Sequence, residues 1–284
     1  KKLLTWQGQR ELRSSSRRRD KRRKTFLRTL FHLHPAEGGA WPMIKKVVIA
    51  AAGQGIRMLH LTRNKSKHLI KVQEKPFLAY LLDNLLKAGY SELILVVGYK
   101  AEMMREFLRK YDYRAKVINQ FDILGGKEKE YGTLCPLKCV KDVVGKENFL
   151  MVYGDNLYSV KDLRALNIDD DYNYIAGFYH EHPEKYGVLI SDNGFLKEII
   201  EKPKKYVGNL INTGLYKFTP EVFDKIPQIC RSSRGEYELT DAITLLAKEK
   251  KVKIKKIQDY WLDFGRPSDI IRVSKFLKNR ISEN

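Results

Sequence analysis

Long apolar runs and paired cysteines are both missing from this 284-residue sequence. No stretch of about 18 consecutive apolar residues occurs, and the amino terminus lacks the apolar core of a secretory signal, so we expect neither a membrane span nor classical export. The expected location is therefore the cytoplasm. The three cysteines, Cys135, Cys139 and Cys230, show no C-x-x-C spacing, which excludes a disulfide framework and argues against a structural zinc site. Cys135 and Cys139 are four residues apart, a spacing that predicts neighbours on one face of a helix.

Acidic side chains are few relative to basic ones, since 54 Lys and Arg against 34 Asp and Glu give a net charge of +20. Residues 1–42 hold 12 of the basic residues and only 3 of the acidic ones, so this segment alone carries +9. Its low-complexity run from Ser14 to Lys24 is self-repelling and predicts no packed core. We interpret residues 1–42 as a basic, flexible extension, or as sequence translated ahead of a start at Met43. A basic arm that binds nucleic acid or an acidic membrane is the alternative, which we disfavour because runs of like charge are usually solvated tails.

The remaining residues, 43–284, are expected to form one globular α/β domain, because 43% of the chain is hydrophobic. From Ile44 onward short apolar runs alternate with amphipathic stretches, which is typical of βαβ units and a mostly parallel sheet. Strands are expected at residues 46–51, 92–98, 116–119, 148–153, 174–179, 187–190, 196–200, 214–218 and 252–257, the later ones in mixed directions. Helices are expected at residues 76–88, 100–110, 221–225, 238–248 and 267–278.

A glycine turn with cations beside it follows the first predicted strand. The apolar run from Val47 ends in Gly53-Gln54-Gly55, a sequence that exposes backbone N–H groups able to hold phosphate oxygens. Met58 stands where both G-x-G-x-x-G and the P-loop motif require glycine, so neither a dinucleotide fold nor a P-loop is supported. Arg57 and Lys67 come next, and two fixed cations beside such a turn suit a triphosphate.

Several ordered blocks between Ile49 and about Ile271 resemble the sugar-phosphate nucleotidyltransferase family. The first, Gly53-x-Gly55-x-Arg57-Met58 with Leu61-Thr62, Lys67 and Lys75-Pro76, is similar to the family pattern L-A-G-G-x-G-T-R-L-x-P-L-T, P-K-x-L-L-P-V and G-K-P. The departures from that pattern are Ile56, His60, Ser66, Lys71 and Glu74, whereas the cationic positions are kept. The resemblance implies a Rossmann-like nucleotide-diphospho-sugar transferase fold, with a mixed central sheet flanked by helices. It also implies a nucleotide-binding turn and two catalytic cations. These are Ala51, Ala52, Gly53 and Gly55 for the turn, and Arg57 and Lys67 for the cations.

Two aspartates follow predicted strands at distant points of the chain. Asp155 comes after residues 148–153 and Gly154, and Asp263 lies between Trp261 and Gly265. Ligands of open α/β sheets collect at the carboxyl ends of strands, so the two carboxylates can meet over one site. Their surroundings resemble the family's G-D-N and W-x-D-x-G-x-P motifs, and Mg²⁺ takes one or two protein carboxylates together with phosphate oxygens and water. Asp155 and Asp263 are therefore the expected magnesium ligands.

Polar residues between these aspartates suit a sugar phosphate as acceptor. Such a pocket needs a carboxylate and an amide for hydroxyls, backbone N–H groups and a cation. Four blocks resemble, in order, the family's Y-G, E-K-P, N-x-G-x-Y and R-G-E-x-x-L-T-D motifs, and they begin at Tyr186, Glu201, Asn212 and Arg234. By this resemblance Gly187, Glu201, Lys202 and Asn212 are expected to bind the sugar phosphate. We leave Thr240-Asp241, in the last block, out of the site as structural polar groups.

Residues at one strand end and in one loop indicate which nucleobase the nucleotide carries. In relatives that use uridine or thymidine triphosphate, a glutamine at a strand end and a G-[TL]-A loop face the base, and here Gln120 and Gly132-Thr133 take these places. The insert between them, residues 121–131, carries Gly125-Gly126 and alternating Lys and Glu, which predicts a mobile flap.

The expected activity is a Mg²⁺-dependent transfer of a nucleoside monophosphate from UTP or dTTP to a sugar 1-phosphate, with release of pyrophosphate. Cytidylyl transfer to phosphocholine or an inositol phosphate is an alternative on the same fold, which Glu201, Lys202 and Asn212 disfavour. A nucleotide-sugar sensor without turnover is another, which the altered loop around Ile56 favours and the two metal aspartates oppose. Composition leaves the oligomeric state open.

Overall fold

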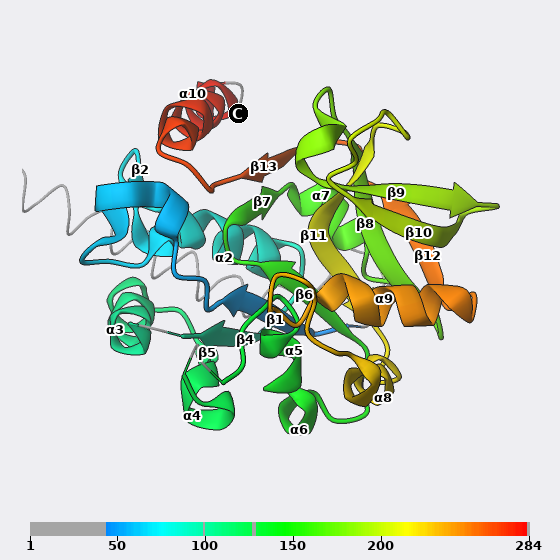
Figure 1. Cartoon of the computed structure of the whole chain (residues 1–284). Helices are drawn as coiled ribbons and strands as arrows, with labels where there is room; N and C mark the ends of the chain where they lie inside the picture. The colour runs from blue at the N-terminus through cyan, green and yellow to red at the C-terminus, as the bar shows by residue number, and fades with distance from the viewer. Residues whose placement is uncertain (1–43, 99, 127–128, 283–284) are drawn as a thin grey trace, which may run out of the picture. The chain divides into compact units, whose positions relative to one another are not determined.

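The computed structural model describes residues 44–98, 100–126 and 129–282, and the predicted basic extension, residues 1–42, lies outside them. A mixed sheet of nine strands runs through the described residues (Figure 1). In chain order its strands are β1 (Lys46–Ala51), β4 (Glu92–Val97), β5 (Ala115–Asn119), β6 (Phe149–Tyr153), β8 (Asn173–Tyr179), β9 (Gly187–Asp192), β10 (Phe195–Glu201), β11 (Leu210–Phe218) and β12 (Val252–Lys256). In space they follow the order β5-β4-β1-β6-β11-β8-β12-β10-β9.

The first half of the sheet is parallel, and β1 is its centre. β1 pairs in parallel with β4 on one side and with β6 on the other, and β5 extends the β4 side. The strand order therefore reverses between β1 and β6, which is where open α/β sheets bind ligands. Next to β6, β11 runs antiparallel, and the remaining strands pair in mixed directions. The predicted α/β fold with a mixed central sheet is confirmed.

Alternate residues of the inner strands bury their side chains on opposite faces of the sheet. In β1, Val47 and Ile49 enter one apolar core and Val48 enters the other. The first core includes side chains of α2 (Phe77–Lys87), α3 (Ala101–Tyr111), α7 (Val160–Ala165) and α10 (Ser268–Ser282). The second includes those of α5 (Cys135–Lys138), α6 (Lys141–Val144), α8 (Val222–Lys225) and α9 (Leu239–Lys248), of which α5, α6 and α8 lie below the sheet in Figure 1. Burial on both faces explains why these strands are continuous apolar runs in the sequence.

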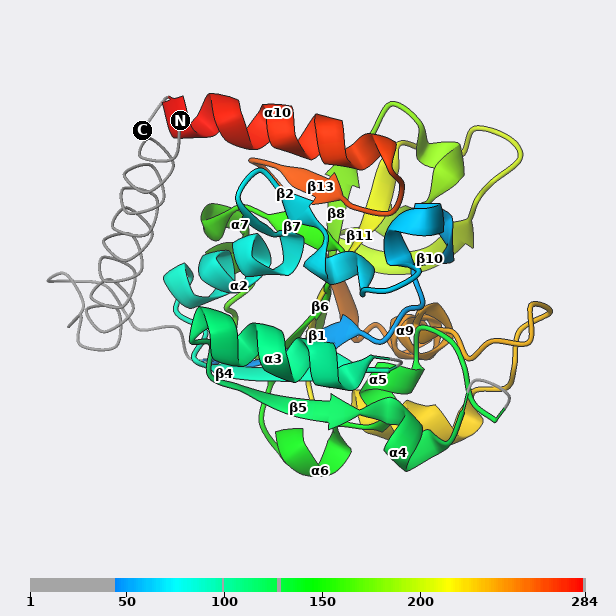
Figure 2. The same cartoon turned by 90° about the vertical axis from the view of Figure 1, so that its left-hand side faces the viewer.

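Several short elements were not expected from the sequence. β7 (Asn156–Tyr158) pairs with β13 (Trp261–Asp263), and β2 (Lys71–Val72) pairs with β3 (Lys75–Pro76). Figure 2 shows α10 lying across β13 and β2. The other short elements are α4 (Gln120–Leu124) and the 3-10 helices η1 (Ile56–Thr62), η2 (Lys67–Leu69), η3 (Pro183–Lys185) and η4 (Ile226–Gln228). Segments this short show no hydrophobic period, so tertiary contacts decide their conformation.

Two segments differ in local structure from what the sequence suggested. β11 begins at Leu210 rather than at residue 214, so Asn212 lies inside a strand. A register shift between Asn212 and Tyr216 interrupts its pairing with β8, and such a bulge hides the strand pattern. The predicted flap at residues 121–131 is not a loop throughout, because residues 120–124 form α4, whose first turn is capped by the Asn119 side chain. Lys127 and Glu128, inside this insert, lie outside the described residues.

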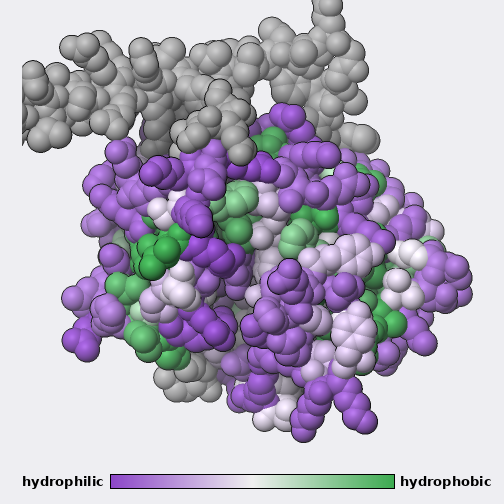
Figure 3. Space-filling model, turned by 90° about the horizontal axis from the view of Figure 1, so that it is seen from above, coloured by the Kyte–Doolittle hydropathy of each residue, from purple (hydrophilic) through white to green (hydrophobic). Residues whose placement is uncertain are grey.

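The surface shows no large apolar face in the view of Figure 3, where hydrophobic residues form small separate areas among hydrophilic ones. The exposed large apolar side chains include Ile271, 76% exposed, and Tyr206, 78% exposed. No helix within the described ranges is long and apolar enough to cross a membrane.

The cysteines are free thiols. Cys135 begins α5 and Cys139 caps its end, which agrees with their predicted place on one helix. Burial raises the pKa of Cys135 to about 11 and that of Cys139 to about 12, so both stay protonated at neutral pH.

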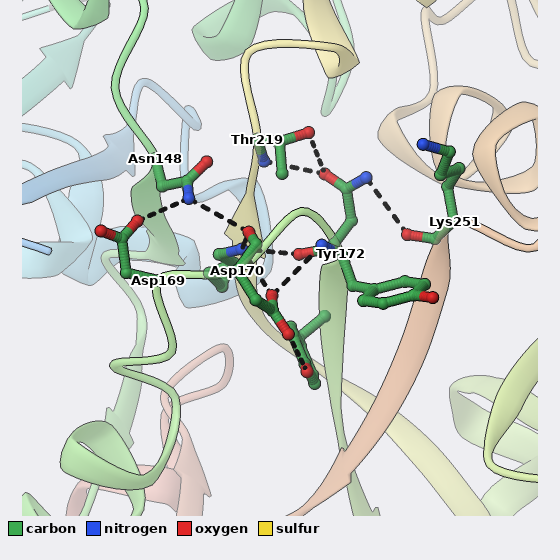
Figure 4. A network of polar contacts seen from close by, with 9 residues as sticks. Asn148, Asp169, Asp170, Tyr172, Thr219 and Lys251 are labelled. Atoms are coloured by element: carbon green, nitrogen blue, oxygen red, sulfur yellow. Dashed lines mark hydrogen bonds and ion pairs between the residues drawn. The ribbon is translucent and has the colours of Figure 1, made fainter. Parts of the chain in front are cut away.

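A buried lysine connects strands at the edge of the sheet where β6 begins. Lys217 of β11 is fully buried, and its ammonium donates to the main-chain oxygen of Tyr172 at 2.6 Å and to the Asp170 carboxylate at 3.1 Å. Tyr174 Oη donates to the same carboxylate at 2.7 Å. Asn148 Nδ2 donates to the main-chain oxygen of Asp170 at 3.2 Å (Figure 4). Every polar group of this buried cluster that we name has a partner, which is the condition for such a network to stabilise a fold.

Replacing Lys217 with methionine is expected to lower the free energy of unfolding by about 2–4 kcal/mol, because the Asp170 carboxylate and two carbonyl groups lose the hydrogen bonds from the buried ammonium. Urea unfolding measures the change. The matched control is Lys248→Met on the exposed side of α9, which should change the free energy by less than about 0.5 kcal/mol. Equal stability of the two variants would contradict a stabilising role for Lys217.

Candidate active site

The glycine turn lies at the carboxyl end of β1, where the strand order reverses. Ala51 ends β1, residues 52–54 follow the strand, and Gly55 precedes η1. Gly55 has a φ of 70°, and a Cβ placed on it would lie 3.1 Å from both Thr62 Cγ2 and Lys67 Cβ. The left-handed backbone and the crowding therefore both require glycine at this position.

Lys67 connects this turn to the aspartate that follows β6. Its ammonium forms an ion pair with Asp155, and a Cβ placed on Gly53 would lie 3.9 Å from Lys67 Nζ. The Asp155 turn is held against β1, because Gly154 N donates to Ala50 O at 2.9 Å. Burial acts to raise the pKa of Asp155, but the charge and hydrogen bond of Lys67 outweigh it and lower that pKa. Asp155 is therefore an anion at neutral pH, with a lysine between it and the glycine turn.

β7 and β13 place the second aspartate beside the first. In their antiparallel register Asp263 lies opposite Asn156, the residue after Asp155. Phe264 N donates to Asp155 O at 2.8 Å, which joins the two segments directly. The fully buried ring of Phe264 stacks on Phe77 of α2 with centroids 4.3 Å apart, and this contact anchors the end of β13. The structure thus joins the two segments that carry Asp155 and Asp263, although they are distant in the chain.

The Asp263 carboxylate accepts hydrogen bonds from two other side chains. Arg272 Nη2, on α10, lies 2.5 Å from Asp263 Oδ1 and also donates to Asp269 Oδ1 at 3.0 Å. Tyr186 Oη donates to Asp263 Oδ2 at 3.4 Å. Burial and then the charge of Asp263 raise the pKa of Tyr186 to about 12, so this hydroxyl keeps its proton at neutral pH. One carboxylate oxygen of Asp263 therefore faces a cation and the other a neutral donor.

Arg57 lies at the same edge of the sheet. It is exposed in η1, and a Cβ placed on Gly265 would lie 3.7 Å from Arg57 Nη2. The guanidinium therefore faces the turn that follows Asp263. The first and the last of the sequence blocks meet here.

β9, β10 and β11 gather the residues expected to hold the acceptor. Gly187 pairs with Glu201 in register, and a Cβ placed on Gly187 would lie 3.0 Å from Glu201 Oε2 and 3.9 Å from Asn212 Cβ. Lys202 Nζ lies 3.9 Å from Glu201 Oε1, and both side chains are about half exposed. These four positions thus form one cluster at the ends of three neighbouring strands.

Two contacts connect this cluster to the aspartates. Tyr186, adjacent to Gly187, reaches Asp263. Gly214 N donates to Asn212 Oδ1 at 3.0 Å, and Gly214 has a φ of 75°. A Cβ placed on Gly214 would lie 3.1 Å from Asn156 Nδ2 and 2.3 Å from the Tyr153 ring. The chain therefore passes the end of β6 at a distance that only glycine permits.

Gln120 and the Gly132-Thr133 loop are positioned by different parts of the chain. Gln120 follows β5 directly, is 2% exposed, and its Oε1 has no hydrogen-bond partner among the described residues. Gly132 lies against the main chain of Tyr237, since a Cβ placed on it would be 2.2 Å from Tyr237 O. Thr133 Oγ1 donates to Glu238 Oε2 at 3.2 Å. The block that begins at Arg234 thus supports this loop.

Comparison with known proteins decides the family. The family model described as nucleotidyl transferase matches residues 46–280. This chain belongs to the nucleotidyl transferase family. Over 232 residues it is 34% identical to a bifunctional sugar-1-phosphate nucleotidylyltransferase/acetyltransferase of Sulfurisphaera tokodaii, an alignment that covers 81% of this chain and 55% of that protein. It is also 33% identical over 233 residues to UTP–glucose-1-phosphate uridylyltransferase AglF of Haloferax volcanii, which covers 79% of this chain and 93% of that protein.

This nucleotidyl transferase thus spans about half the length of the bifunctional relatives it matches. Among solved structures, it superposes on a UDP-glucose pyrophosphorylase complexed with UDP-glucose with a TM-score of 0.72 at 22% identity, covering 84% of this chain and 100% of the other. That likeness supports the predicted Rossmann-like fold.

The donor set of this nucleotidyl transferase fits a divalent cation that arrives with phosphates. Within the described ranges no group of three or more His, Cys, Asp and Glu side chains could form a closed metal cage. Asp155 and Asp263 carry hard carboxylate oxygens on two segments that pair directly. Mg²⁺ commonly takes one or two protein carboxylates and completes its octahedron with phosphate oxygens and water. Two carboxylates on segments beside the glycine turn are therefore compatible with such an ion.

Several residues that contact and position the candidate site residues were not identified from the sequence. His68 is 1% exposed, Ser66 Oγ lies 2.9 Å from its Nδ1, and a Cβ placed on Gly154 would lie 3.1 Å from its ring. Burial and then the charge of Lys67 lower the pKa of His68 to about 3, so the imidazole is neutral. Arg272 could not be predicted as a site residue, because nothing in its local sequence indicates an ion pair with Asp263. Tyr186 had a signal, since it stands in the Y-G block.

Proposed function

We propose that this nucleotidyl transferase moves a nucleoside monophosphate from UTP or dTTP to a sugar 1-phosphate and releases pyrophosphate, with Mg²⁺ as cofactor and residues 43–284 as the catalytic domain. The observation that carries the proposal is the convergence at one sheet edge. There the glycine turn, Lys67, Asp155 and Asp263 adjoin the Gly187, Glu201 and Asn212 cluster. The relatives, which include a bifunctional sugar-1-phosphate nucleotidylyltransferase/acetyltransferase and a UTP–glucose-1-phosphate uridylyltransferase, support the same reaction class.

The acceptor phosphate is already a nucleophile at neutral pH, so positioning and charge neutralisation must supply the rate. Lys67 lies between the glycine turn and Asp155, where it would neutralise charge that builds on the transferred phosphoryl group. Arg57, at the open side of the turn, would hold the leaving pyrophosphate. Asp155 and Asp263 would hold Mg²⁺, which when bound polarises the phosphate oxygens of the nucleotide.

The acceptor cluster offers both kinds of hydrogen-bonding group. Glu201 carries a half-exposed carboxylate that can accept from two sugar hydroxyls, and Lys202 supplies a cation for the phosphate. Asn212 is oriented by its bonds to Gly214 N and, at 2.9 Å, to Tyr216 Oη. It would therefore present a fixed amide edge to the sugar.

Gln120 supports the choice of base. Its Oε1 is buried and unpartnered among the described residues, and such an acceptor is costly unless a ligand supplies a donor. The imide N–H of uracil or thymine is a donor of this kind. This favours UTP or dTTP together with the uridylyltransferase relative.

The test is pyrophosphate release from each common nucleoside triphosphate against several sugar 1-phosphates and phosphocholine, with and without Mg²⁺. Release with UTP or dTTP and one sugar 1-phosphate, dependent on Mg²⁺, is the expected result. Release with CTP and phosphocholine would replace the sugar phosphate with an alcohol phosphate. Triphosphate binding without release from any pair would instead make the protein a sensor.

A further inference from the structure

The Asp263 carboxylate is occupied by groups of the same chain. Arg272 Nη2 lies 2.5 Å from Asp263 Oδ1 and donates to the main-chain oxygen of Asp263 at 2.7 Å. It also donates to Asp269 Oδ1 at 3.0 Å. Asp269 is itself fixed, because its Oδ2 accepts from Gly265 N at 2.9 Å and from Arg266 N at 2.8 Å. The first turns of α10 thus hold a guanidinium against the carboxylate.

The guanidinium uses one lone pair of Asp263 Oδ1 and places a positive charge beside the other. Arg272 and a divalent cation at Asp263 would repel each other at short range. The Arg272 and Asp263 side chains are 45% and 35% exposed, so the ion pair can open without leaving a charge buried. Asp269 remains beside Arg272 as a second anionic partner when the first is taken.

Lys67 differs from Arg272 in its surroundings, although it pairs with the other aspartate. Lys67 is 11% exposed and lies against the glycine turn, where a bound triphosphate would meet it. Arg272 approaches from α10 and contacts Asp263 and Asp269. Its position therefore suits competition with the metal.

We propose that Arg272 is a competing cation for Asp263: it keeps the metal affinity of the nucleotide-free protein low and yields the carboxylate to a divalent cation that arrives with the triphosphate. The inference rests on the proposed function, because it requires Asp155 and Asp263 to be metal ligands. Arg272 thereby sets the order of binding: the free metal ion binds weakly, and the metal ion in complex with the nucleotide binds preferentially.

The experiment measures Mn²⁺ binding to the full chain without nucleotide, by titration calorimetry or by the EPR signal of free Mn²⁺. Arg272→Gln is expected to lower the Mn²⁺ dissociation constant by about tenfold, because a competing charge is removed. Arg272→Lys keeps the charge and should stay near the parent value. Arg266→Gln is the matched control, since it removes an exposed arginine from the turn just before α10 and should change Mn²⁺ binding less than about twofold.

Unchanged or weaker Mn²⁺ binding by Arg272→Gln overturns the proposal, and weaker binding would show instead that Arg272 orients Asp263 for the metal. Arg272→Met, which keeps the aliphatic stem, replaces the glutamine variant if circular dichroism shows that the latter is unfolded. The proposed function fails in a different way. If Asp155→Asn and Asp263→Asn leave Mn²⁺ binding of the parent unchanged, the metal site itself is absent.

Discussion

Replacing Lys67 with alanine is expected to lower turnover by about 10²- to 10³-fold and to leave the fold intact, because a fixed cation beside the reacting phosphate acts mainly in the transition state. Lys67 is positioned by η2 between the glycine turn and Asp155, and its removal takes away a charge without opening either core. Steady-state pyrophosphate release measures turnover, and thermal unfolding checks the fold. Lys71→Ala is the matched control, since Lys71 is an exposed lysine of the same segment, and it should retain turnover within about twofold.

The same variant has a second readout in its pH dependence. In the parent, Lys67 lowers the pKa of Asp155 against the effect of burial, so Mn²⁺ binding should be lost only as the pH falls through that lowered value. Without Lys67, the largest effect that opposes burial is lost, so the pKa of Asp155 rises and binding should be lost at a higher pH. An unchanged pH profile together with unchanged turnover would remove Lys67 from the catalytic role.

Asp155→Asn is expected to cost about 10³-fold in turnover, because the amide supplies no negative charge to the metal and leaves Lys67 without its ion partner. The substitution is nearly isosteric, so Gly154 and the Ala50 contact should keep the turn in place. Mn²⁺ affinity should fall along with turnover. Asp192→Asn, at the exposed end of β9, is the control and should behave like the parent in both measurements.

A drop in turnover with parental Mn²⁺ affinity would assign Asp155 a role toward Lys67 alone. Parental turnover in Asp155→Asn would contradict the proposed reaction, because no other carboxylate among the described residues follows β6 at this edge.

The long elements of the fold could be predicted because their own residues determine them. The strand at residues 46–51 is an apolar run that is buried on both faces, and α3 follows the spacing of Met104, Phe107 and Leu108. Each of these patterns repeats over six or more residues, which is long enough to reveal a period. Elements of two or three residues, such as β7 and β13, have no such period and form where the tertiary structure pairs them.

The candidate site was likewise only partly predictable from the sequence. Gly55, Lys67, Asp155 and Asp263 could be singled out because their types and order form a recognisable series of blocks along the chain. Spacing along the chain could not show that Asp263 lies opposite Asn156, because a pairing of two short strands more than a hundred residues apart depends on the whole sheet between them.

The sequence by itself therefore determined the fold class, the family and the residue types at the sheet edge, since these depend on local patterns and on ordered motifs. Only the tertiary structure decided the partners of those residues: the neutral His68 under Gly154, the support of Thr133 by Glu238, and the guanidinium of Arg272 on Asp263. These contacts join segments that are distant in the chain or lie across a helix turn. Their energies arise from burial and charge in three dimensions, which no pattern along one dimension encodes.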